Sequence, residues 1–159
     1  MIDDFSPTFH ARLQELTADE KFPRRRDGVL VSPTVVRSTL SPRPVDYEEG
    51  DECPLVRWSL YQGTRDRQEY LHKIIINCLV WTPGTPADGA DAIERLVLAC
   101  LRIADGRGLA GHRLVLPVEY FFGEQGEHDK DGIQPHPYHQ GGVKLQYAAP
   151  AGRAICPRT

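Results

Sequence analysis

Residues 69–81 read Glu-Tyr-Leu-His-Lys-Ile-Ile-Ile-Asn-Cys-Leu-Val-Trp and contain the longest apolar run of the chain, which only Asn77 interrupts. In a β-strand, alternate side chains point to opposite faces of the sheet. One face would then carry Ile74, Ile76, Cys78 and Val80, and the other face would carry Ile75, Leu79 and Trp81. Because both faces are apolar, we expect a central strand that is covered on both sides, or that a neighbouring subunit covers on one side.

A second apolar segment, Leu55–Gln62, precedes this strand and is also rich in branched and aromatic side chains. The two segments are separated by the polar stretch 63–68, which begins with a glycine. This pattern predicts a long hairpin. The prolines and glycine of residues 82–86 then end the second strand.

The N-terminal segment shows the periodicity of an amphipathic helix. Its apolar residues recur at spacings of three and four, namely Ile2, Phe5, Phe9, Leu13 and Leu16. Proline is tolerated only in the first turn of a helix, so Pro7 fits if the helix begins near Ser6.

A second helix is predicted from about Asp88 or Asp91 to about Asp105. Its apolar face carries Ile93, Leu96, Val97, Cys100, Leu101 and Ala104. Asp88 or Asp91 can cap the first amides, and Gly106 or Gly108 can close the end.

Shorter β-rich stretches complete the pattern, and they are Val29–Val31, Val35–Leu40, His112–Phe122 and Gly142–Ala149. Pro117 favours an edge position or a bulge in the third of them. The order of elements predicts the α+β class, with two main helices packed on a mixed or antiparallel sheet of about four to five strands. We expect one domain over residues 1–150, followed by a tail, 151–159, that gains structure only against a partner.

Composition argues against several classes of protein. The formal net charge of −3 over 159 residues gives no global reason to bind nucleic acid. No stretch approaches the roughly 18 apolar residues of a membrane span, and the acidic N-terminus lacks the order of a signal peptide. We therefore expect folding in a reducing cytoplasm, which suits four widely spaced cysteines that stay free.

No motif points clearly to catalysis. The best metal candidate is the pair His136 and His139, with His128, Asp129 and Asp131 nearby in sequence. A metal needs three or four converging ligands and this HxxH supplies two, so we favour a polar loop that enters a strand. The nucleophile and phosphate-loop motifs are absent from the sequence. We expect neither an enzyme nor a cofactor.

Charged residues cluster in two segments. A basic turn carries Arg24, Arg25 and Arg26, and an acidic loop spans Asp46–Glu52. If these groups lie on different faces, they suit a head-to-tail contact between subunits, because such heterologous contacts close into rings.

Three segments of the chain resemble the tail terminators of long-tailed bacteriophages and related small prophage proteins. The first is the opening helix, from Met1 to Leu16. The second joins Leu71–Cys78 of the hairpin to Ala92–Leu96 of the second helix. The third, from Gln134 to Pro150, resembles the family's proline and aromatic pattern before the last strand.

The resemblance implies a structural virion protein of the tail or neck, assembled in the host cytoplasm. Such a protein has a mixed sheet flanked by helices and forms a homo-oligomeric, six-membered ring. The ring caps the tail tube, ends its elongation and presents a surface to the head-side connector or stopper. The DNA passes through the lumen without specific binding, and no membrane is involved.

Within this interpretation, two charged groups are candidate contacts between rings. The basic group is Arg24, Arg25, Arg26, Arg65 and Arg67, and the complementary acidic group is Asp46, Glu48, Glu49, Asp51 and Glu52. A head-tail connector or stopper is the first alternative function. A metal-dependent hydrolase that uses His128, His136 and His139 is the second, and a small nucleic-acid-binding regulator is the third.

Overall fold

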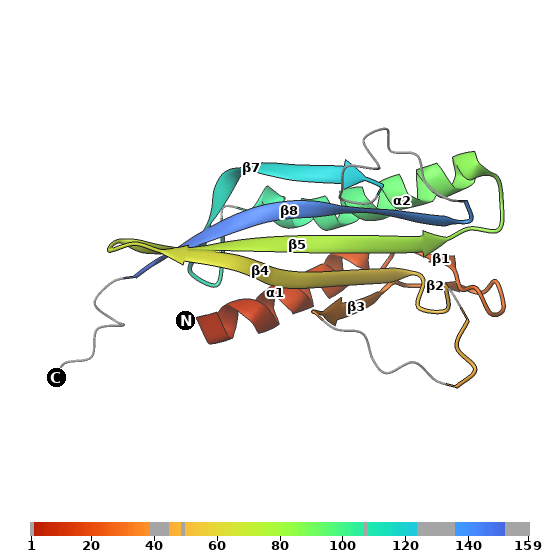
Figure 1. Cartoon of the computed structure of the whole chain (residues 1–159), viewed down its shortest axis with the longest axis horizontal. Helices are drawn as coiled ribbons and strands as arrows, with labels where there is room; N and C mark the ends of the chain where they lie inside the picture. Colours follow the sequence, from red (N-terminus) through yellow and green to blue (C-terminus); the bar gives the residue numbers. More distant parts are fainter. Residues whose placement is uncertain (1, 39–44, 49, 107, 124–135, 152–159) are drawn as a thin grey trace.

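The computed structural model describes residues 2–38, 45–48, 50–106, 108–123 and 136–151. Its elements are α1 (Ile2–Thr17), β1 (Phe22–Pro23), β2 (Leu30–Val31), β3 (Thr34–Arg37), β4 (Leu55–Arg65), β5 (Glu69–Trp81), α2 (Pro86–Leu101), a 3-10 turn (Arg102–Asp105), β6 (Gly108–Leu109), β7 (His112–Phe122) and β8 (Tyr138–Pro150). The helices lie behind the curled sheet in the view of Figure 1. This arrangement confirms the α+β class.

The main sheet has six strands in the order β3-β4-β5-β8-β7-β6, and β1 pairs with β2 in a separate small sheet. Strand β3 runs parallel to β4, and every other neighbouring pair in the main sheet is antiparallel. The predicted count of about four to five strands is therefore too low. The outer strand β3, Thr34–Arg37, overlaps the predicted stretch Val35–Leu40. The other outer strand, β6, has only two residues, which is too short for a visible alternation of apolar and polar side chains.

The central hairpin of β4 and β5 follows the prediction closely. Alternate side chains of β5 are fully buried, namely Ile74, Ile76, Cys78 and Val80, each with 0% of its surface exposed. Strand β4 continues three residues past the predicted end at Gln62. The turn that joins the strands is closed by Asp66, whose Oδ1 accepts the backbone N–H groups of Gln68 at 2.7 Å and Glu69 at 2.8 Å.

Helix α1 begins at Ile2, the first residue of the predicted apolar stripe. The condition of a start near Ser6 does not hold, and Pro7 lies inside the helix. The missing amide of Pro7 costs one intrahelical hydrogen bond. The extra turn carries Phe5 into the core, where its ring lies 5.5 Å from Phe9 and 5.0 Å from Tyr147. We attribute the early start to this aromatic burial, which offsets the lost bond.

Helix α2 also begins earlier than predicted, and Thr85 rather than an aspartate is its N-cap. The amide of Asp88 donates to Thr85 Oγ1 at 3.2 Å, and the amide of Thr85 donates to Asp88 Oδ2 at 2.9 Å. This reciprocal capping box satisfies two amides that would otherwise lack partners. None of the helices in the described part of the chain combines the length and the apolar character of a membrane-spanning segment.

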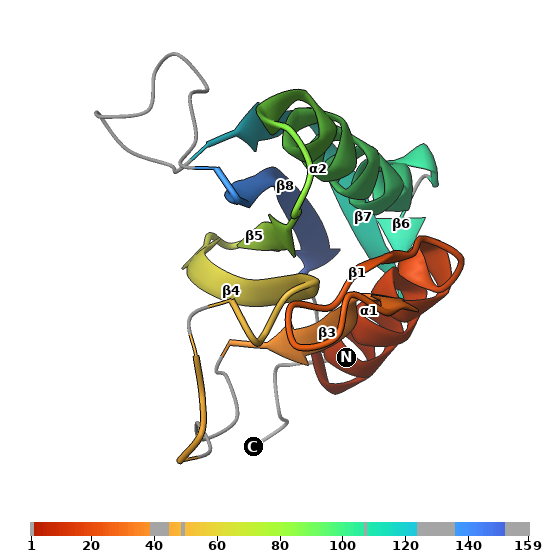
Figure 2. The ribbon, with the colours of Figure 1, turned by 90° about the vertical axis from the view of Figure 1, so that its right-hand side faces the viewer.

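Both helices pack on the same side of the sheet (Figure 2). Between the two layers lie the aromatic rings of Phe9 and Trp58, 4.7 Å apart, together with the buried side chains of β5 and β8. In β7 the register against β8 shifts between Val115 and Glu119, the interval that contains Pro117. This irregularity agrees with the prediction of an edge position or a bulge at Pro117.

The second face of the sheet has no helix over it among the described residues, and it faces the viewer in Figure 1. It carries Ile75, Leu79 and Trp81 of β5, which are half-buried. We call this surface the open face. The two apolar faces of β5 led us to expect either cover on both sides within the chain or cover on one side by a neighbouring subunit. In the described part of the chain, helices cover one face only, so the first explanation does not hold there.

Neighbouring isoleucines on opposite faces of β5 provide a direct test of this one-sided burial. Ile76→Ala should lower the free energy of unfolding by about 2–5 kcal/mol, because it leaves a cavity in the core. The matched change Ile75→Ala on the open face should cost only about 1 kcal/mol, because less surface is buried there. Urea denaturation of dilute protein measures both, and equal costs would contradict the layer arrangement.

Candidate functional site

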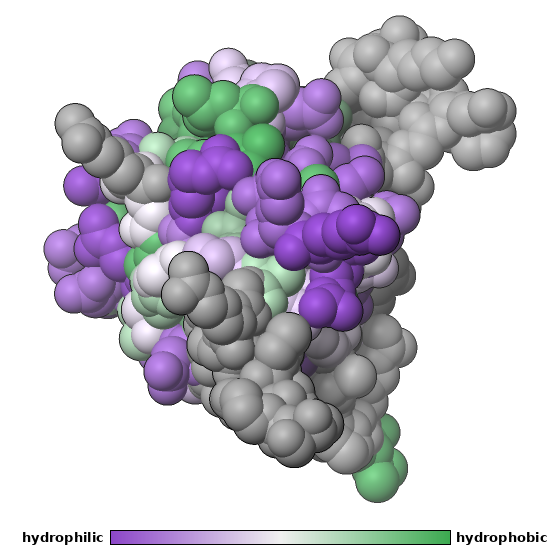
Figure 3. All heavy atoms as spheres, turned by 90° about the vertical axis from the view of Figure 1, so that its left-hand side faces the viewer, coloured by the Kyte–Doolittle hydropathy of each residue, from purple (hydrophilic) through white to green (hydrophobic). Residues whose placement is uncertain are grey.

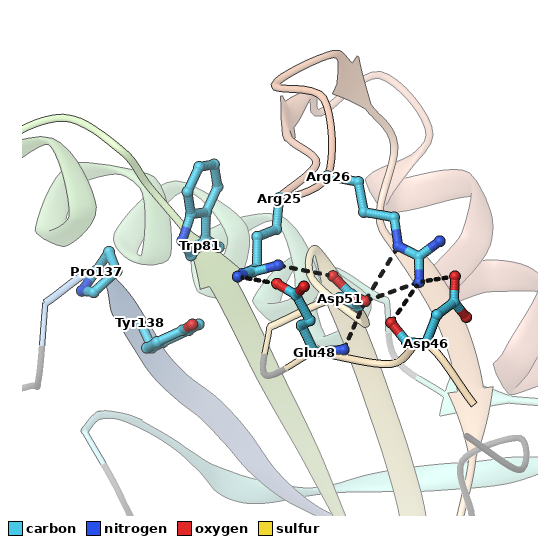
Figure 4. A pocket seen from close by; sticks show the side chains of 8 residues that line it. All are labelled: Arg25, Arg26, Asp46, Glu48, Asp51, Trp81, Pro137 and Tyr138. Atoms are coloured by element: carbon cyan, nitrogen blue, oxygen red, sulfur yellow. Dashed lines mark hydrogen bonds and ion pairs between the residues drawn. The ribbon is translucent and has the colours of Figure 1, made fainter. Parts of the chain in front are cut away.

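A pocket with a volume of about 700 Å³ lies at the end of the sheet where β5 ends and β8 begins. Figure 4 shows the side chains that line it, which are Arg25, Arg26, Asp46, Glu48, Asp51, Trp81, Pro137 and Tyr138. They come from three parts of the chain, namely the β1–β2 turn, the acidic loop before β4, and the adjoining ends of β5 and β8.

The β1–β2 turn sets the directions of its three arginines. Gly28 adopts a positive φ of 70°, a conformation that favours glycine, and its amide donates to the Arg24 carbonyl oxygen at 2.7 Å. Arg24 pairs within the turn with Asp27, at 2.6 Å. The next two arginines, Arg25 and Arg26, reach the acidic loop instead (Figure 4).

Asp51 lies at the centre of this network. Only 8% of its side chain is exposed, and it pairs with Arg25 at 3.3 Å and Arg26 at 3.1 Å. Its Oδ2 also accepts the amide of Glu48 at 2.9 Å. Two further pairs join the same segments, Arg25 with Glu48 at 2.5 Å and Arg26 with Asp46 at 3.3 Å. The network therefore holds the acidic loop against the basic turn.

The hydrogen bonds to Asp51 favour its charged form. The amide of Glu48 makes the largest contribution to lowering the pKa of Asp51, and Arg26 and Arg25 add to it, while partial burial acts in the opposite direction. Charge-assisted hydrogen bonds of this kind are stronger than neutral ones. Asp51 is thus a structural anchor whose lone pairs are already used.

The basic turn and the acidic loop are therefore neighbours in the same chain. The condition of separate faces, under which these groups would suit a head-to-tail contact, does not hold for Arg25, Arg26, Asp46, Glu48 and Asp51. Their sequence separation of 20 to 26 residues gave no sign of this closeness. Whether they also contact an adjoining ring stays a prediction.

The remaining candidate residues lie outside this pocket. Glu52 accepts a hydrogen bond from the Tyr47 hydroxyl, and Glu49 lies outside the described residues. Arg65 and Arg67 belong to the tip of the β4–β5 hairpin, at the opposite end of the long axis (Figure 1). The guanidinium of Arg65 lies 5.3 Å from the centre of the Tyr70 ring. Figure 3 views this end of the molecule, where hydrophilic side chains predominate.

The structure brings together the two histidines of the HxxH motif. His136 Nδ1 and His139 Nε2 are 3.2 Å apart, and His139 is only 5% exposed. Burial, with a smaller contribution from His136, lowers the pKa of His139. A hydrogen bond between the two imidazole rings accounts for the distance.

A metal ion at this pair would need further ligands. Within the described ranges, no group of three or more His, Cys, Asp or Glu side chains could hold one. His128, Asp129 and Asp131 lie outside the described residues.

Three cysteines are described, and all are buried and free. Burial raises the pKa of Cys53 to about 12, and the charge of Glu52 adds to the effect. The sulfur atoms of Cys78 and Cys100 lie 3.7 Å apart, and their contact together with burial raises the pKa of Cys78. A nucleophilic cysteine requires the opposite shift, so these thiols serve as small apolar side chains.

No protein-family model matches the chain, and a search of curated proteins also found no match.

Replacing Asp51 with asparagine should destabilise the protein in a pH-dependent way. The pKa of Asp51 is lower in the folded chain than its ordinary value of 3.8. Its stabilisation is therefore complete above pH 3.8 and is lost as the pH falls toward the lowered pKa. The stability difference between wild type and Asp51→Asn should be largest near neutral pH and should narrow below pH 3.8.

Urea denaturation at a series of pH values measures this difference. Asp19→Asn is the control, because Asp19 is exposed and has no hydrogen bond or ion pair among the described residues. This substitution should lower the free energy of unfolding only slightly. If the stability difference between wild type and Asp51→Asn widens in acid, the pKa of Asp51 is not lowered in the folded chain and the prediction is wrong.

The close approach of His139 to helix α2 gives a separate prediction. A Cβ atom at Gly89 would collide with the His139 ring. In an open helix, replacing glycine with alanine stabilises by about 0.8–1 kcal/mol, but here we expect Gly89→Ala to destabilise.

A double-mutant cycle tests the cause. Combining Gly89→Ala with His139→Ala should remove most of the penalty, and Ala90→Gly on the exposed side of the same helix should cost about 1 kcal/mol. Thermal unfolding measures each variant, and stabilisation by Gly89→Ala alone would refute the close packing.

Proposed function

We propose that the protein is a structural subunit that assembles into a ring, caps a phage tail tube and joins it to the head-side connector. The observation that carries the assembly role is the open face. It leaves half-buried apolar side chains, Ile75 and Leu79 among them, without a covering layer in the described part of the chain. Surfaces of this kind are typical of contacts between proteins.

The assignment to the phage tail rests on the three segments of sequence that resemble tail terminators. A mixed sheet with two helices, which the resemblance implies, is compatible with the observed layers. The tail-terminator fold itself, the six-membered ring and the location in the virion are parts of this proposal.

Charge at the hairpin tip supports a contact along the tail axis. Arg67 is exposed and has no ion pair among the described residues, and Arg65 contacts only the Tyr70 ring there. In contrast, Arg25 and Arg26 already pair with carboxylates of their own chain. The hairpin tip is therefore the better candidate for contact with an adjoining ring.

Electron microscopy of particles assembled without this protein tests the role. Overlong or irregular tails beside separate DNA-filled heads are expected, because nothing would stop the addition of tube subunits. Tails of normal length beside leaking heads would instead indicate the connector or stopper. Fully normal particles would refute both roles.

Complementation then tests the hairpin tip. Wild type and the control variant Arg12→Glu, on the exposed side of α1, should restore infectious particles. The double variant Arg65→Glu, Arg67→Glu should fold and yet fail to join tails to heads, because it reverses the charge of the tip. Normal titres from this variant would exclude the tip as a contact.

A further inference from the structure

The open face carries more positive than negative charge. Strand register aligns Arg57 with Asn77, and Ile75 with Lys144, while Lys73 lies two residues before Ile75 on the same face. None of the three cations, Arg57, Lys73 and Lys144, has an ion-pair partner among the described residues. Of the carboxylates on this face, Glu119 on β7 lies opposite Lys144 in the register, and Glu69 pairs with Arg113 at 3.3 Å.

The centre of the open face is apolar. Ile75 and Leu79 are half-buried, and a Cβ atom at Gly142 would lie 2.7 Å from the Phe121 ring, so this ring lies across β8. The face therefore combines apolar side chains with cations at its margin. This composition suits an acidic partner surface with an apolar centre.

The outer face of helix α2 has the complementary composition. Asp91, Glu94 and Leu98 are spaced so that they form one stripe along the helix. Leu98 is 41% exposed, and the stripe borders a hollow of about 280 Å³. Neither carboxylate has an ion pair within the described ranges.

The neighbouring cation on α2 does not neutralise this stripe. Arg95 pairs with Glu20 at 3.0 Å, donates to the Lys21 carbonyl oxygen at 2.6 Å, and lies 4.4 Å from the centre of the Phe22 ring. Arg95 also lines the hollow, but its charge is paired with Glu20, so the two carboxylates of the stripe stay without an ion pair in the described part of the chain. Helix α1 differs, because its exposed Glu15 pairs with Arg12 at 3.0 Å.

The two complementary surfaces lie on opposite sides of the molecule, the sheet on one side and α2 on the other (Figure 2). One copy cannot satisfy both by itself, but a second copy placed head to tail can. Pairing through sheet edges is a weaker route, because the outer strands β3 and β6 have only four and two residues.

We propose that the open face of one copy binds the outer face of helix α2 of a second copy. Lys73 and Lys144 then meet Asp91 and Glu94, and Leu98 packs against Ile75. The contact is heterologous, so each copy uses both surfaces and the assembly has one direction. This inference rests on the proposed function, because it names the contact that holds the ring together.

Charge reversal on each surface tests the contact in the purified full-length chain. Sedimentation velocity over a range of concentrations should show self-association of wild type. Lys144→Glu and Glu94→Lys should each raise the dissociation constant for self-association about tenfold or more, because like charges then face one another. Both substitutions change exposed or half-buried side chains, and circular dichroism should show that both variants stay folded.

Rescue separates a direct contact from a general charge effect. Mixing the two variants in equal amounts should restore association, because each wild-type surface then meets a wild-type surface and the reversed surfaces meet each other. The double variant Lys144→Glu, Glu94→Lys should also associate. The matched control Arg12→Glu, on the exposed side of α1, should associate like wild type.

Several outcomes would overturn the inference. The first is a dissociation constant above about 1 mM for self-association of the wild-type chain. The second is a pair of single charge reversals that leave the dissociation constant unchanged. The third is a failure to restore association both in the mixture and in the double variant. The proposed function fails separately. Rescue by charge exchange together with normal particles in the absence of the protein would keep this contact and reject the tail role.

Discussion

Strand β5 buries four alternate side chains in the core between the sheet and the helix layer, and the rest of the architecture depends on this one-sided burial. Ile74, Ile76, Cys78 and Val80 have no exposed surface, so a shift of register by one residue would move polar Asn77 into the core. The same alternation places Ile75, Leu79 and Trp81 on the other face. With both helices on one side, these residues must find cover elsewhere or stay half in water.

Ion pairs, rather than apolar packing, hold the acidic loop before β4 against the basic turn between β1 and β2. The acidic loop before β4 has few apolar side chains to bury, yet Asp51 joins it to the basic turn through two arginines and a backbone amide. Exposed ion pairs contribute little one at a time, but a partly buried carboxylate shared by two guanidiniums restricts both segments. Charges that are paired within the chain are less free to attract a partner. The cations of the open face and the hairpin tip, which have no ion pair among the described residues, are therefore better candidates for such a contact.

Periodicity predicted the elements that have long apolar patterns. It did not predict the helix starts or the charged contacts, which depend on tertiary packing, capping and ion pairing. Strands β5 and β7 begin and end where the sequence placed them, because long alternating or apolar runs carry their own signal. Pro7 left the start of α1 open, and the burial of Phe5 overrides the rule about proline. The start of α2 was missed because Thr85 forms the cap together with Asp88. The pairing of Arg25 and Arg26 with Asp51 links residues 25 or 26 positions apart, and charge patterns in one sequence do not specify such partners. The approach of His136 to His139 depends on the turn that precedes β8, which spacing alone does not describe.

A molecule with an acidic helix stripe on one side and a cationic sheet face on the other cannot form a symmetric dimer through either surface, because like charges would then meet. Association through unlike surfaces must either run on as a filament or close into a ring. The choice depends on the angle between the two surfaces, which the curl of the sheet and the packing of α2 on it determine. The short outer strands remove the competing route of edge-to-edge addition, which would extend without limit. In the proposed assembly, the open sheet face and the acidic stripe of α2 would together supply both the attraction and the direction that a closed ring requires.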